Sequence, residues 1–557
     1  MQYKIRYFKV GQPPVDNLEV HFRSANISKS AVGRQNAMEL VFSNPIVGFF
    51  SNGNPRRFFT TPQGDNVFEA MRADDGYMNF EERIELYVSN SKDYSEDIVV
   101  PDNLVFSGQI LQVEPHVGET QTDIKVTCAD RTFVLLNRIG ANDYAERSAM
   151  EIIQQVVRDF TFYKSSMEGA FNKQGVYGVG GGHTYPIDAR LFTEGIKGGV
   201  DVVTNVSSDG RVITCATATF ITDGVNEGDV VKNNVNFSVA LVREIISETE
   251  LRVSKSIFTA GHTINVSDGF IQDWRADGTA FPDISFGFRN KPLSEWIDNM
   301  VDAEFTNTRD EIGQGAEVML RPMRYYIDGY NRLHVFYPDN VPSYKMLVGA
   351  DGPIEDDPNT YRFYEHKMQK SVFDIMNFVI FRAGLDMNNN TIRGFYQDPT
   401  LGGPTTKNSY RPFLSIAPIM KFEDTGPGRL TQVDSETWEY PADYGTGYVP
   451  NWNPDVTVNS DAEYNTEFRK AARRRGIARA RDKVNLSANP RWRGSANLEG
   501  FNFTMADLCR LTDRSVGINR ILVRIDSMQH NVTPTGWFTT LQLVEDIPLQ
   551  RRLSLGA

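Results

Sequence analysis

Cysteine is scarce in this sequence, and its placement argues against two common uses of the residue. The 557 residues include three cysteines, Cys128, Cys215 and Cys509, which lie far apart and form no C-x-x-C pair. A disulfide framework or a thiolate zinc site needs several cysteines at short spacings. The sequence therefore disfavours both kinds of site and favours a reducing compartment.

Long apolar runs and an excess of positive charge are also missing. No stretch of about 18 apolar residues occurs, and the first ten residues, MQYKIRYFKV, alternate charged and apolar side chains. A signal peptide would place a basic region before an apolar run, so we expect a chain that is neither secreted by the usual route nor membrane-spanning. The net charge of -13 disfavours a general binder of nucleic acid or membrane surfaces.

The sequence contains no complete motif for binding a metal ion or a phosphate group. The seven histidines form no H-x-x-x-H or H-E-x-x-H pair, so nothing indicates zinc chemistry. The glycine-rich segment 175–183 lacks the Lys-Ser/Thr of a phosphate loop and is expected to be a flexible loop. Asp386, Asn388 and Asn390 have the spacing of a calcium loop, but Gln397 stands where a glutamate belongs, which favours an asparagine-rich turn. We expect no cofactor, no metal and no catalytic residue.

One stretch, residues 106–139, brings several reactive residue types together. Cys128 with Asp130 and Arg131 is compatible with a nucleophile and charged helpers. Alternate residues leading up to Cys128 are apolar, however, which predicts a strand with this cysteine on its buried face. His116 falls on the opposite strand of the predicted hairpin. We therefore favour the interpretation as scaffold, a core cysteine beside an ion pair at a strand end.

Most of the chain has the pattern of strands. Its length suggests roughly three to four domains, and 40% hydrophobic residues are enough to give each a core. Gly108, inside an apolar run, predicts a bulge or a barrel corner. The first predicted strands are Lys4–Val10, Leu18–Phe22, Met38–Phe42 and Glu82–Val88.

Two amphipathic helices are expected among the strands. Residues 148–160 repeat apolar side chains at helical spacing, and Ser148 with Glu151 forms a capping box. Residues 291–305 place apolar side chains on one helical face. The following segment, 323–339, has the pattern of two strands joined by a tight turn.

The later part of the chain contains two segments that interrupt the main pattern. A separate β-module is expected at 197–272, and a last β-region starts at 373–384 and continues at 520–546. Residues 401–460 contain seven prolines, which disfavour regular structure. A long irregular segment inside a compact protein is usually functional, so we interpret it as a partner-binding arm or a lid.

The predicted fold class is mainly β with α+β parts, comprising two tube-like β-barrel domains, an α+β middle domain and a small inserted β domain. The expected division is 1–140, first tube-like barrel; 141–196, helix and linker; 197–272, inserted β domain; 273–370, α+β middle domain; 371–400, start of the second barrel; 401–484, irregular arm and basic helix; and 485–557, rest of the second barrel.

The order of these signals resembles the baseplate hub proteins of long-tailed bacteriophages, the late control protein D superfamily, which includes the hub part of type VI secretion spikes. The resemblance rests on the strand with Gly108, the A-D-x-x-x-x-L strand end at 129–135 and the capped helix that follows. It continues in order through PLSEWIDNMV, YYIDGYNRLHVFYP, DIMNFVIFRAG and RIDSMQHNVTPTGWFTTLQLVED. By eye it covers roughly half of the chain.

This resemblance implies a homotrimeric ring in which each copy donates two barrels. Six barrels then match a sixfold tail tube, while the threefold symmetry suits a trimeric tip. The implied partners are further copies of the chain, a tail tube or distal tail protein, a tip, spike or fibre protein, and a tape measure protein. The implied location is the virion, at the tail baseplate or tip, after assembly in the host cytoplasm. Residues 197–272 and 401–460 depart from the family pattern, and we interpret 197–272 as a surface decoration that contacts neighbours.

A basic helix is expected near residue 475. It could contact DNA passing through the ring without sequence specificity, since motifs for base readout are absent, or dock on an acidic neighbour. The acidic chain favours the second interpretation. The subunit-facing or DNA-facing candidates are Arg469, Lys470, Arg473, Arg474, Arg475, Arg479 and Arg481.

The sequence therefore predicts a structural hub with no enzymatic activity, joining a tail tube to a tip around a central channel. The alternative is a receptor-binding or carbohydrate-active tail protein. The aromatic residues of 438–454 favour that alternative, with Trp438 and Trp452 as candidate glycan contacts.

Overall fold

The structure is a computed structural model, and it describes a large part of the chain. The described residues are 1–8, 18–30, 35–44, 46–49, 55–57, 82–90, 98–99, 103–117, 122–161, 187–275, 278, 280–281, 283–301, 323–329, 331–337, 346–349, 360–370, 378–385, 390–397, 420–424, 431–432, 438–439, 469, 491–501, 503, 505 and 507–546.

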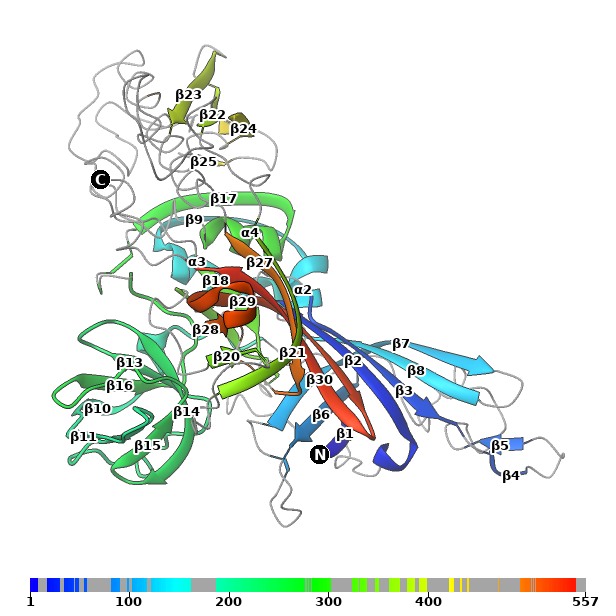
Figure 1. Cartoon of the computed structure of the whole chain (residues 1–557). Coiled ribbons are helices and arrows are strands. Elements are labelled where there is room, and N and C mark those ends of the chain that lie inside the picture. Colours follow the sequence, from blue (N-terminus) through cyan, green and yellow to red (C-terminus); the bar gives the residue numbers. More distant parts are fainter. Residues whose placement is uncertain are drawn as a thin grey trace, which may run out of the picture.

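Strands dominate the fold, and twelve of them form one continuous sheet (Figure 1). Their order is β1-β6-β7-β8-β3-β2-β29-β28-β20-β21-β27-β30. Six lie early in the chain: β1 (Gln2–Phe8), β2 (Phe22–Ser30), β3 (Ala37–Ser43), β6 (Arg83–Ser89), β7 (Leu104–Val117) and β8 (Thr122–Ala129). Six lie late: β20 (Met346–Val348), β21 (Thr360–Lys370), β27 (Trp492–Glu499), β28 (Leu508–Asp513), β29 (Ile518–Thr533) and β30 (Gly536–Glu545). The chain is mainly β, as predicted.

The six late strands close into a barrel, which we call the second barrel. Closure occurs because β30 pairs with β27 on one side and with β29 on the other. Alternate side chains point inward, as the period of two in a strand requires. The buried core includes Leu347, Phe363, Leu498, Leu511, Leu541 and Leu543.

The six early strands, which we call the first barrel, curve around their own core in the order β1-β6-β7-β8-β3-β2. Among the described residues β1 and β2 are not paired with each other, so this barrel is open between them. Val532 and Trp537 of the second barrel are also part of this core, so the two barrels are packed together. The buried residues of the first barrel include Ile5, Phe42, Leu86, Val113, Val126 and Cys128.

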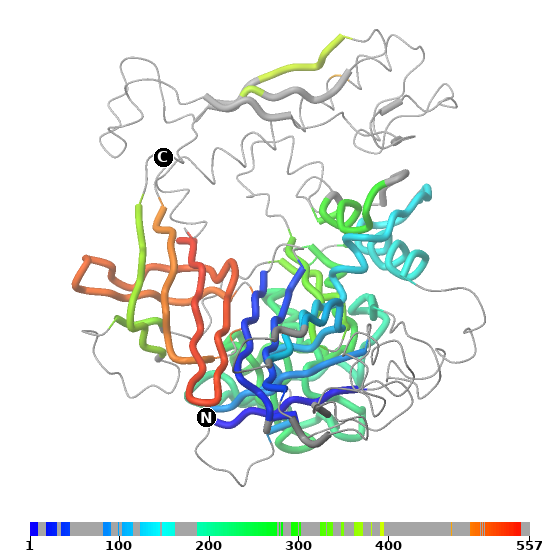
Figure 2. Tube along the Cα trace, turned by 90° about the vertical axis from the view of Figure 1, so that its right-hand side faces the viewer, coloured from blue at the N-terminus to red at the C-terminus, as the bar shows by residue number. Residues whose placement is uncertain are grey.

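A backbone ladder joins the two barrels side by side. Residues Ala25–Ser30 of β2 pair antiparallel with Ser527–Val532 of β29. Figure 2 shows the orange and red strands of the second barrel continuing into the blue strands of the first. The junction is therefore made by strand pairing as well as by side-chain packing.

Helices and short strands form a middle part with a separate core. The sequence predicted the helix at 148–160 with its capping box, and both reciprocal bonds are present: the Ser148 N–H donates to Glu151 (2.8 Å) and the Glu151 N–H donates to Ser148 Oγ (3.2 Å). Trp296 is fully buried in this core. The elements are α2 (Thr132–Asn137), α3 (Ala149–Thr161), α4 (Leu293–Met300), paired β9 (Ile139–Ser148) and β17 (Asp283–Pro292), and the hairpin β18 (Arg324–Ile327) with β19 (Leu333–Phe336).

The segment from Ile196 to Ser267 forms a sheet of seven strands, which we call the insertion. Gly224 and Gly228 of this segment have φ of 72° and 89°, where glycine is favoured. The strands pair in the order β10-β16-β13-β14-β15-β12-β11. They are β10 (Ile196–Val202), β11 (Asn205–Val206), β12 (Val212–Thr214), β13 (Val230–Asn233), β14 (Val239–Ser247), β15 (Glu250–Val253) and β16 (Thr263–Ser267).

Two predicted strands have a different role in the structure. The predicted strand at 18–22 is mostly the 3-10 helix η1 (Leu18–His21), and the strand β2 follows it. The segment 371–400, expected to start the second barrel, contains β22 (Phe378–Leu385) and β23 (Thr391–Gln397), which pair with β24 (Met420–Asp424) in a separate sheet. The barrel strands β20 and β21 lie instead within 346–370, where the sequence predicted the middle domain.

Smaller pairings complete the described fold. β4 (Ile46–Phe49) pairs with β5 (Pro55–Arg57), and β25 (Thr431–Gln432) with β26 (Trp438–Glu439). Apart from β24, β25 and β26, the proline-rich segment 401–460 lies outside the described residues. No helix in the described part of the chain is long and apolar enough to cross a membrane.

Asp130, at the end of β8, holds β3 and α2 together. Its buried carboxylate accepts four hydrogen bonds: from Asn36 Nδ2 (2.6 Å), the Asn36 N–H (3.3 Å), the Thr132 N–H (3.1 Å) and Thr132 Oγ1 (3.0 Å). Asn36 immediately precedes β3, and Thr132 starts α2. The A-D motif of the sequence is therefore a structural joint.

Replacing Asp130 with Ala should loosen this joint. Asp130→Ala leaves four buried donors without an acceptor, which costs about 3 kcal/mol, or about a hundredfold in local opening. Hydrogen exchange of the β3 amides should therefore become about a hundredfold faster. Asp143→Ala, at an exposed position of β9, is the control and should leave β3 exchange unchanged. Equal exchange in both variants would contradict the assigned role of Asp130.

Candidate functional site

The two barrels are structural repeats of each other. The early order β1-β6-β7-β8-β3-β2 corresponds to the late order β20-β28-β29-β30-β27-β21. The β7–β8 ladder is interrupted between Ile110 and Gln112, and the corresponding β29–β30 ladder between Ile525 and Ser527. Leu111 and Asp526 are therefore equivalent bulge residues.

A second pair of bulges confirms this equivalence. The β2–β3 ladder shifts between Phe22 and Ser24, and the corresponding β21–β27 ladder shifts between Phe363 and Glu365. Arg23 and Tyr364 are therefore equivalent. Bulges interrupt the alternation of a strand at one defined point, so they fix the residue-by-residue match between the two barrels.

Eight strands continue across both barrels as one antiparallel wall. We define the wall as β7-β8-β3-β2 of the first barrel followed by β29-β30-β27-β21 of the second, since each neighbouring pair is antiparallel. Figures 1 and 2 both show these long strands side by side. Each barrel supplies four strands, so the junction of β2 with β29 is the centre of the wall.

Both outer edges of the wall are half unpaired. β6 pairs with β7 only at Leu104–Gln109, and the Ile110 N–H donates to the Glu82 carbonyl (2.9 Å), which leaves 111–117 without a further strand partner among the described residues. β20 pairs with β21 only at Thr360–Arg362, which leaves 363–370 also without a further strand partner on that edge among the described residues. Unpaired edges present a row of backbone donors and acceptors to another chain.

The wall face that points away from both barrel cores is polar. Its exposed or half-buried side chains at the junction include Asn26, Ser28, Gln529, Asn531 and Thr540, with Phe538 as a large apolar exception. A groove of about 460 Å³ lies among these residues. Cross-strand ion pairs occur on the first barrel, between Lys125 and Glu39 (2.8 Å) and between Arg23 and Asp123 (3.0 Å).

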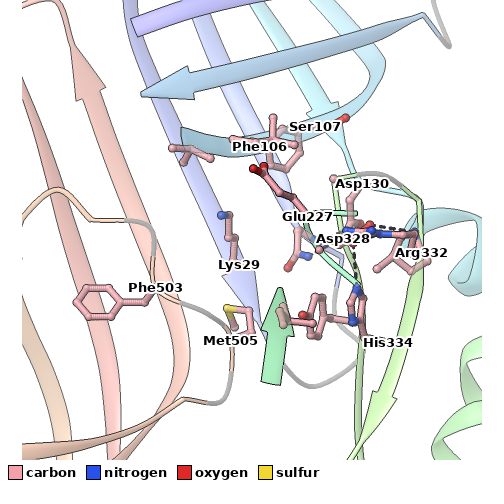
Figure 3. A pocket seen from close by; sticks show the side chains of 18 of the residues that line it. Lys29, Phe106, Ser107, Asp130, Glu227, Asp328, Arg332, His334, Phe503 and Met505 are labelled. Atoms are coloured by element: carbon pink, nitrogen blue, oxygen red, sulfur yellow. Dashed lines mark hydrogen bonds and ion pairs between the residues drawn. The ribbon is translucent and has the colours of Figure 1, made fainter. Parts of the chain in front are cut away.

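A cavity of about 160 Å³ lies where both barrels, the insertion and the β18–β19 hairpin meet (Figure 3). Burial lowers the pKa of Lys29 to about 7. Burial raises the pKa of Asp130 to about 7, against hydrogen bonds from Thr132 and Asn36 that lower it. The polar and charged lining residues are Lys29, Asn36, Ser107, Asp130, Glu227, Arg243, Asp328, Arg332 and His334.

Asp328 forms the best-defined ion pair of this cavity. Its carboxylate accepts hydrogen bonds from Arg332 Nε (2.6 Å) and His334 Nε2 (2.9 Å), as Figure 3 shows. Burial alone would raise the pKa of Asp328, but the charge of Arg332 and the bond from His334 outweigh it and hold this pKa well below its usual value. Burial lowers the pKa of His334, against the carboxylate of Asp328, which raises it.

The chain that leads into the insertion is anchored on this hairpin, and one turn of the insertion packs against it. Asp188 donates its N–H to the Asn331 carbonyl (2.8 Å), and the Leu333 N–H donates to the Asp188 carbonyl (2.8 Å). A side chain at Gly228 of the insertion would stand 2.8 Å from Arg332 Nη2, so this turn packs directly against the ion pair. Arg190 adds ion pairs to Asp188 (2.6 Å) and to Asp268 (2.9 Å). These contacts place the insertion in the common junction and not only at the surface.

The suspected reactive cluster at 106–139 is scaffold. Cys128 is fully buried in the first core, and this burial raises the pKa of its thiol. Its partner on β7 is Ile110, whereas His116 is paired with Asp123 further along the hairpin. No group of three or more His, Cys, Asp or Glu residues that could hold a metal ion occurs within the described ranges.

Several sequence candidates lie largely outside the described residues. Of the basic helix, Arg469 is described; it is helical and exposed. Lys470, Arg473, Arg474, Arg475, Arg479 and Arg481 lie outside, as do 175–183, Asp386, Asn388 and Trp452. Sequence reasoning missed β21, although TYRFYEHKMQK has alternating aromatic residues at its start. It also did not identify the wall, because ladder contacts leave no local sequence motif.

Removing the charge of Asp328 should destabilise the junction. Asp328→Asn leaves the half-buried Arg332 without its counter-charge, a loss of about 2 kcal/mol for a charge-assisted hydrogen bond. Glu244→Gln, which breaks the exposed pair with Arg252 (2.8 Å), is the matched control and should cost at most about 1 kcal/mol. Thermal unfolding at neutral pH would measure both losses, and equal losses would contradict the assigned importance of Asp328.

The same variant should change the response to acid. A carboxylate with a lowered pKa stabilises the folded state above its unfolded pKa and loses that contribution as the pH falls toward its folded pKa. The difference in melting temperature between the wild type and Asp328→Asn should therefore narrow below about pH 4. A difference that widens on acidification would show that Asp328 is not ionised in the folded protein.

No protein-family model and no curated protein sequence matches the chain. Solved structures match along most of it, and three of them are as follows. A tail protein from Neisseria meningitidis MC58 has a TM-score of 0.44 and 7% identity, covering 99% of both chains. The 43 kDa tail protein of prophage MuSo2 from Shewanella oneidensis has a TM-score of 0.42 and 9% sequence identity, and the match covers 99% of both chains. The E. coli type VI secretion component c3393 has a TM-score of 0.35 and 6% sequence identity, and the match covers 95% of this chain and 74% of that one. The structures similar to this chain are thus tail proteins and a secretion-system component described as similar to phage tail proteins.

Proposed function

We propose that this chain is a structural hub at the distal end of a phage tail. Three copies form a ring that joins a sixfold tail tube to a threefold tip and encloses a central channel. The role is assembly and not catalysis. The chain then works as an adaptor. Each copy presents two equivalent barrels to the tube, but only one insertion and one β18–β19 hairpin to the tip.

The repeat of the two barrels is the observation that carries this proposal. Equivalent bulges at Leu111 and Asp526, and at Arg23 and Tyr364, give both barrels the same local geometry. A neighbour that docks against one barrel can dock against the other in the same way. Three chains therefore supply six equivalent units for a sixfold partner, while the insertion and the hairpin occur three times.

The polar wall face supports the assignment of the channel surface. Neutral side chains such as Asn26, Ser28, Gln529 and Asn531 stay hydrated and offer neither a large apolar patch nor a row of cations to hold a passing chain. The charged pairs on this face neutralise each other locally. Such a surface suits a passage for a tape measure protein and DNA without strong binding.

The further partners follow from the two ends of such a ring. A tail tube or distal tail protein meets the barrels, and a tip, spike or fibre protein meets the threefold end. The chain is then a virion component of the baseplate or tail tip, assembled in the host cytoplasm. The barrels are the surface that we assign to the sixfold neighbour.

The ring is tested by native mass and negative-stain imaging of the purified protein. We expect a complex of three times the 62.9 kDa chain mass, seen as a threefold ring with a central channel. Addition of purified tail-tube protein should cap this ring. A chain that stays monomeric with and without tail-tube protein would exclude the hub, and glycan binding would then test the alternative of a receptor-binding tail protein.

The basic helix is assigned to subunit docking. Replacing Arg473, Arg474 and Arg475 with Glu reverses three charges, which should repel an acidic neighbour and abolish the ring. The matched control replaces the same three residues with Lys, retains the charge and should preserve the ring. Rings that form normally with the three Glu replacements would remove the docking assignment and leave contact with DNA to be tested.

A further inference from the structure

We propose that neighbouring copies join through one specific strand pairing, between the free half of β21 in one copy and the free half of β7 in the next. This inference rests on the proposed function for its partner, a second copy of the chain. It goes further by naming the two edges, the direction of pairing and the register of residues. The paired segments are 366–370 and 113–117.

The junction inside the chain provides the template. There, β2 of the first barrel pairs with β29 of the second barrel. β21 is the equivalent of β2, and β7 is the equivalent of β29, as the matched bulges establish. Repeating the same barrel-to-barrel step beyond the second barrel therefore places β21 against β7 of another copy. Both edges are unpaired over the required length in the described part of the chain.

The template also fixes the register. Ser28 pairs with Gln529 inside the chain; counting from the bulges, Gln369 is equivalent to Ser28 and Glu114 to Gln529. The pairing between copies is therefore Gln369 with Glu114, antiparallel. The whole ladder is His366 with Val117, Lys367 with His116, Met368 with Pro115, Gln369 with Glu114 and Lys370 with Val113.

Backbone chemistry and charge are compatible with this ladder. The β21 edge carries Lys367 and Lys370 against one acid, Glu365, whereas the β7 edge carries Glu114. Edge lysines are a usual protection of an unpaired strand, and here they lie near an acidic residue. Pro115 has no N–H, so at this position the ladder can contain at most one hydrogen bond, from the Met368 N–H to the Pro115 carbonyl. Edge positions tolerate a proline.

Disulfide trapping tests the register directly. The double variant Glu114→Cys with Gln369→Cys places one thiol on each edge, and both native side chains are exposed. The two edge strands are seven inter-strand spacings apart, about 34 Å along the wall, so a bond between these cysteines must join two chains. The three native cysteines are buried and should not compete. Mild oxidation should convert the single-chain band on a non-reducing gel into covalent dimers and trimers, and reduction should restore it.

Two matched controls calibrate the experiment. Ser28→Cys with Gln529→Cys occupies the template positions, so it should form a bond within one chain and leave the gel mass unchanged. Gln112→Cys with Gln369→Cys uses the same face of β7 but a position displaced along the strand. Because a disulfide needs Cβ atoms about 4 Å apart, this displaced pair should give far less cross-linked product.

Each outcome distinguishes the register from the ring. Covalent trimers from the predicted pair, with little product from the displaced pair, support the inference. Rings in which the template pair oxidises but the predicted pair does not would overturn the strand pairing and leave the hub intact. Equal cross-linking of the predicted and displaced pairs would overturn the register. A protein that forms no ring at all would remove both proposals.

Discussion

The backbone ladder between β2 and β29 is the interaction on which the rest of the architecture depends. Along one edge β29 serves two partners in turn, since Ile518–Arg524 pair with β28 and Ser527–Val532 pair with β2, while its other edge pairs with β30. Asp526, the bulge residue, lies between these two halves. A bulge bends a strand and increases its twist, so one continuous strand can close its own barrel and then extend the sheet into the neighbouring one.

The equivalent bulge in β7 has the same consequence. Leu104–Gln109 pair with β6, and beyond Leu111 the strand continues without a second partner among the described residues. The two strands therefore differ in one respect: β29 meets β2 of its own chain, and the corresponding half of β7 remains available. A chain with two equivalent barrels and one internal junction necessarily has one unmatched edge at each end of its wall.

Sequence patterns predicted the local structure better than the arrangement of strands. The capping box at Ser148 and Glu151 and the burial of Cys128 follow from spacings of a few residues, and both are present. The bulges also leave a trace, because buried residues spaced by two shift to a spacing of three, as from Ile525 to Met528. The second barrel was placed wrongly at 371–400 because β20 and β21 are short or polar, while the apolar run FVIFRAGL belongs to another sheet.

The two barrels match most closely in their four wall strands. The four wall strands correspond residue by residue, including both bulges, but the strands behind them differ. β1 is antiparallel to β6, whereas its equivalent β20 is parallel to β28 and closes the second barrel. In a ring of equivalent junctions, every wall must present the same strand spacing and twist to its neighbours. In the proposed ring the rear strands take no part in the junctions between walls, so their direction is free to differ without changing those junctions.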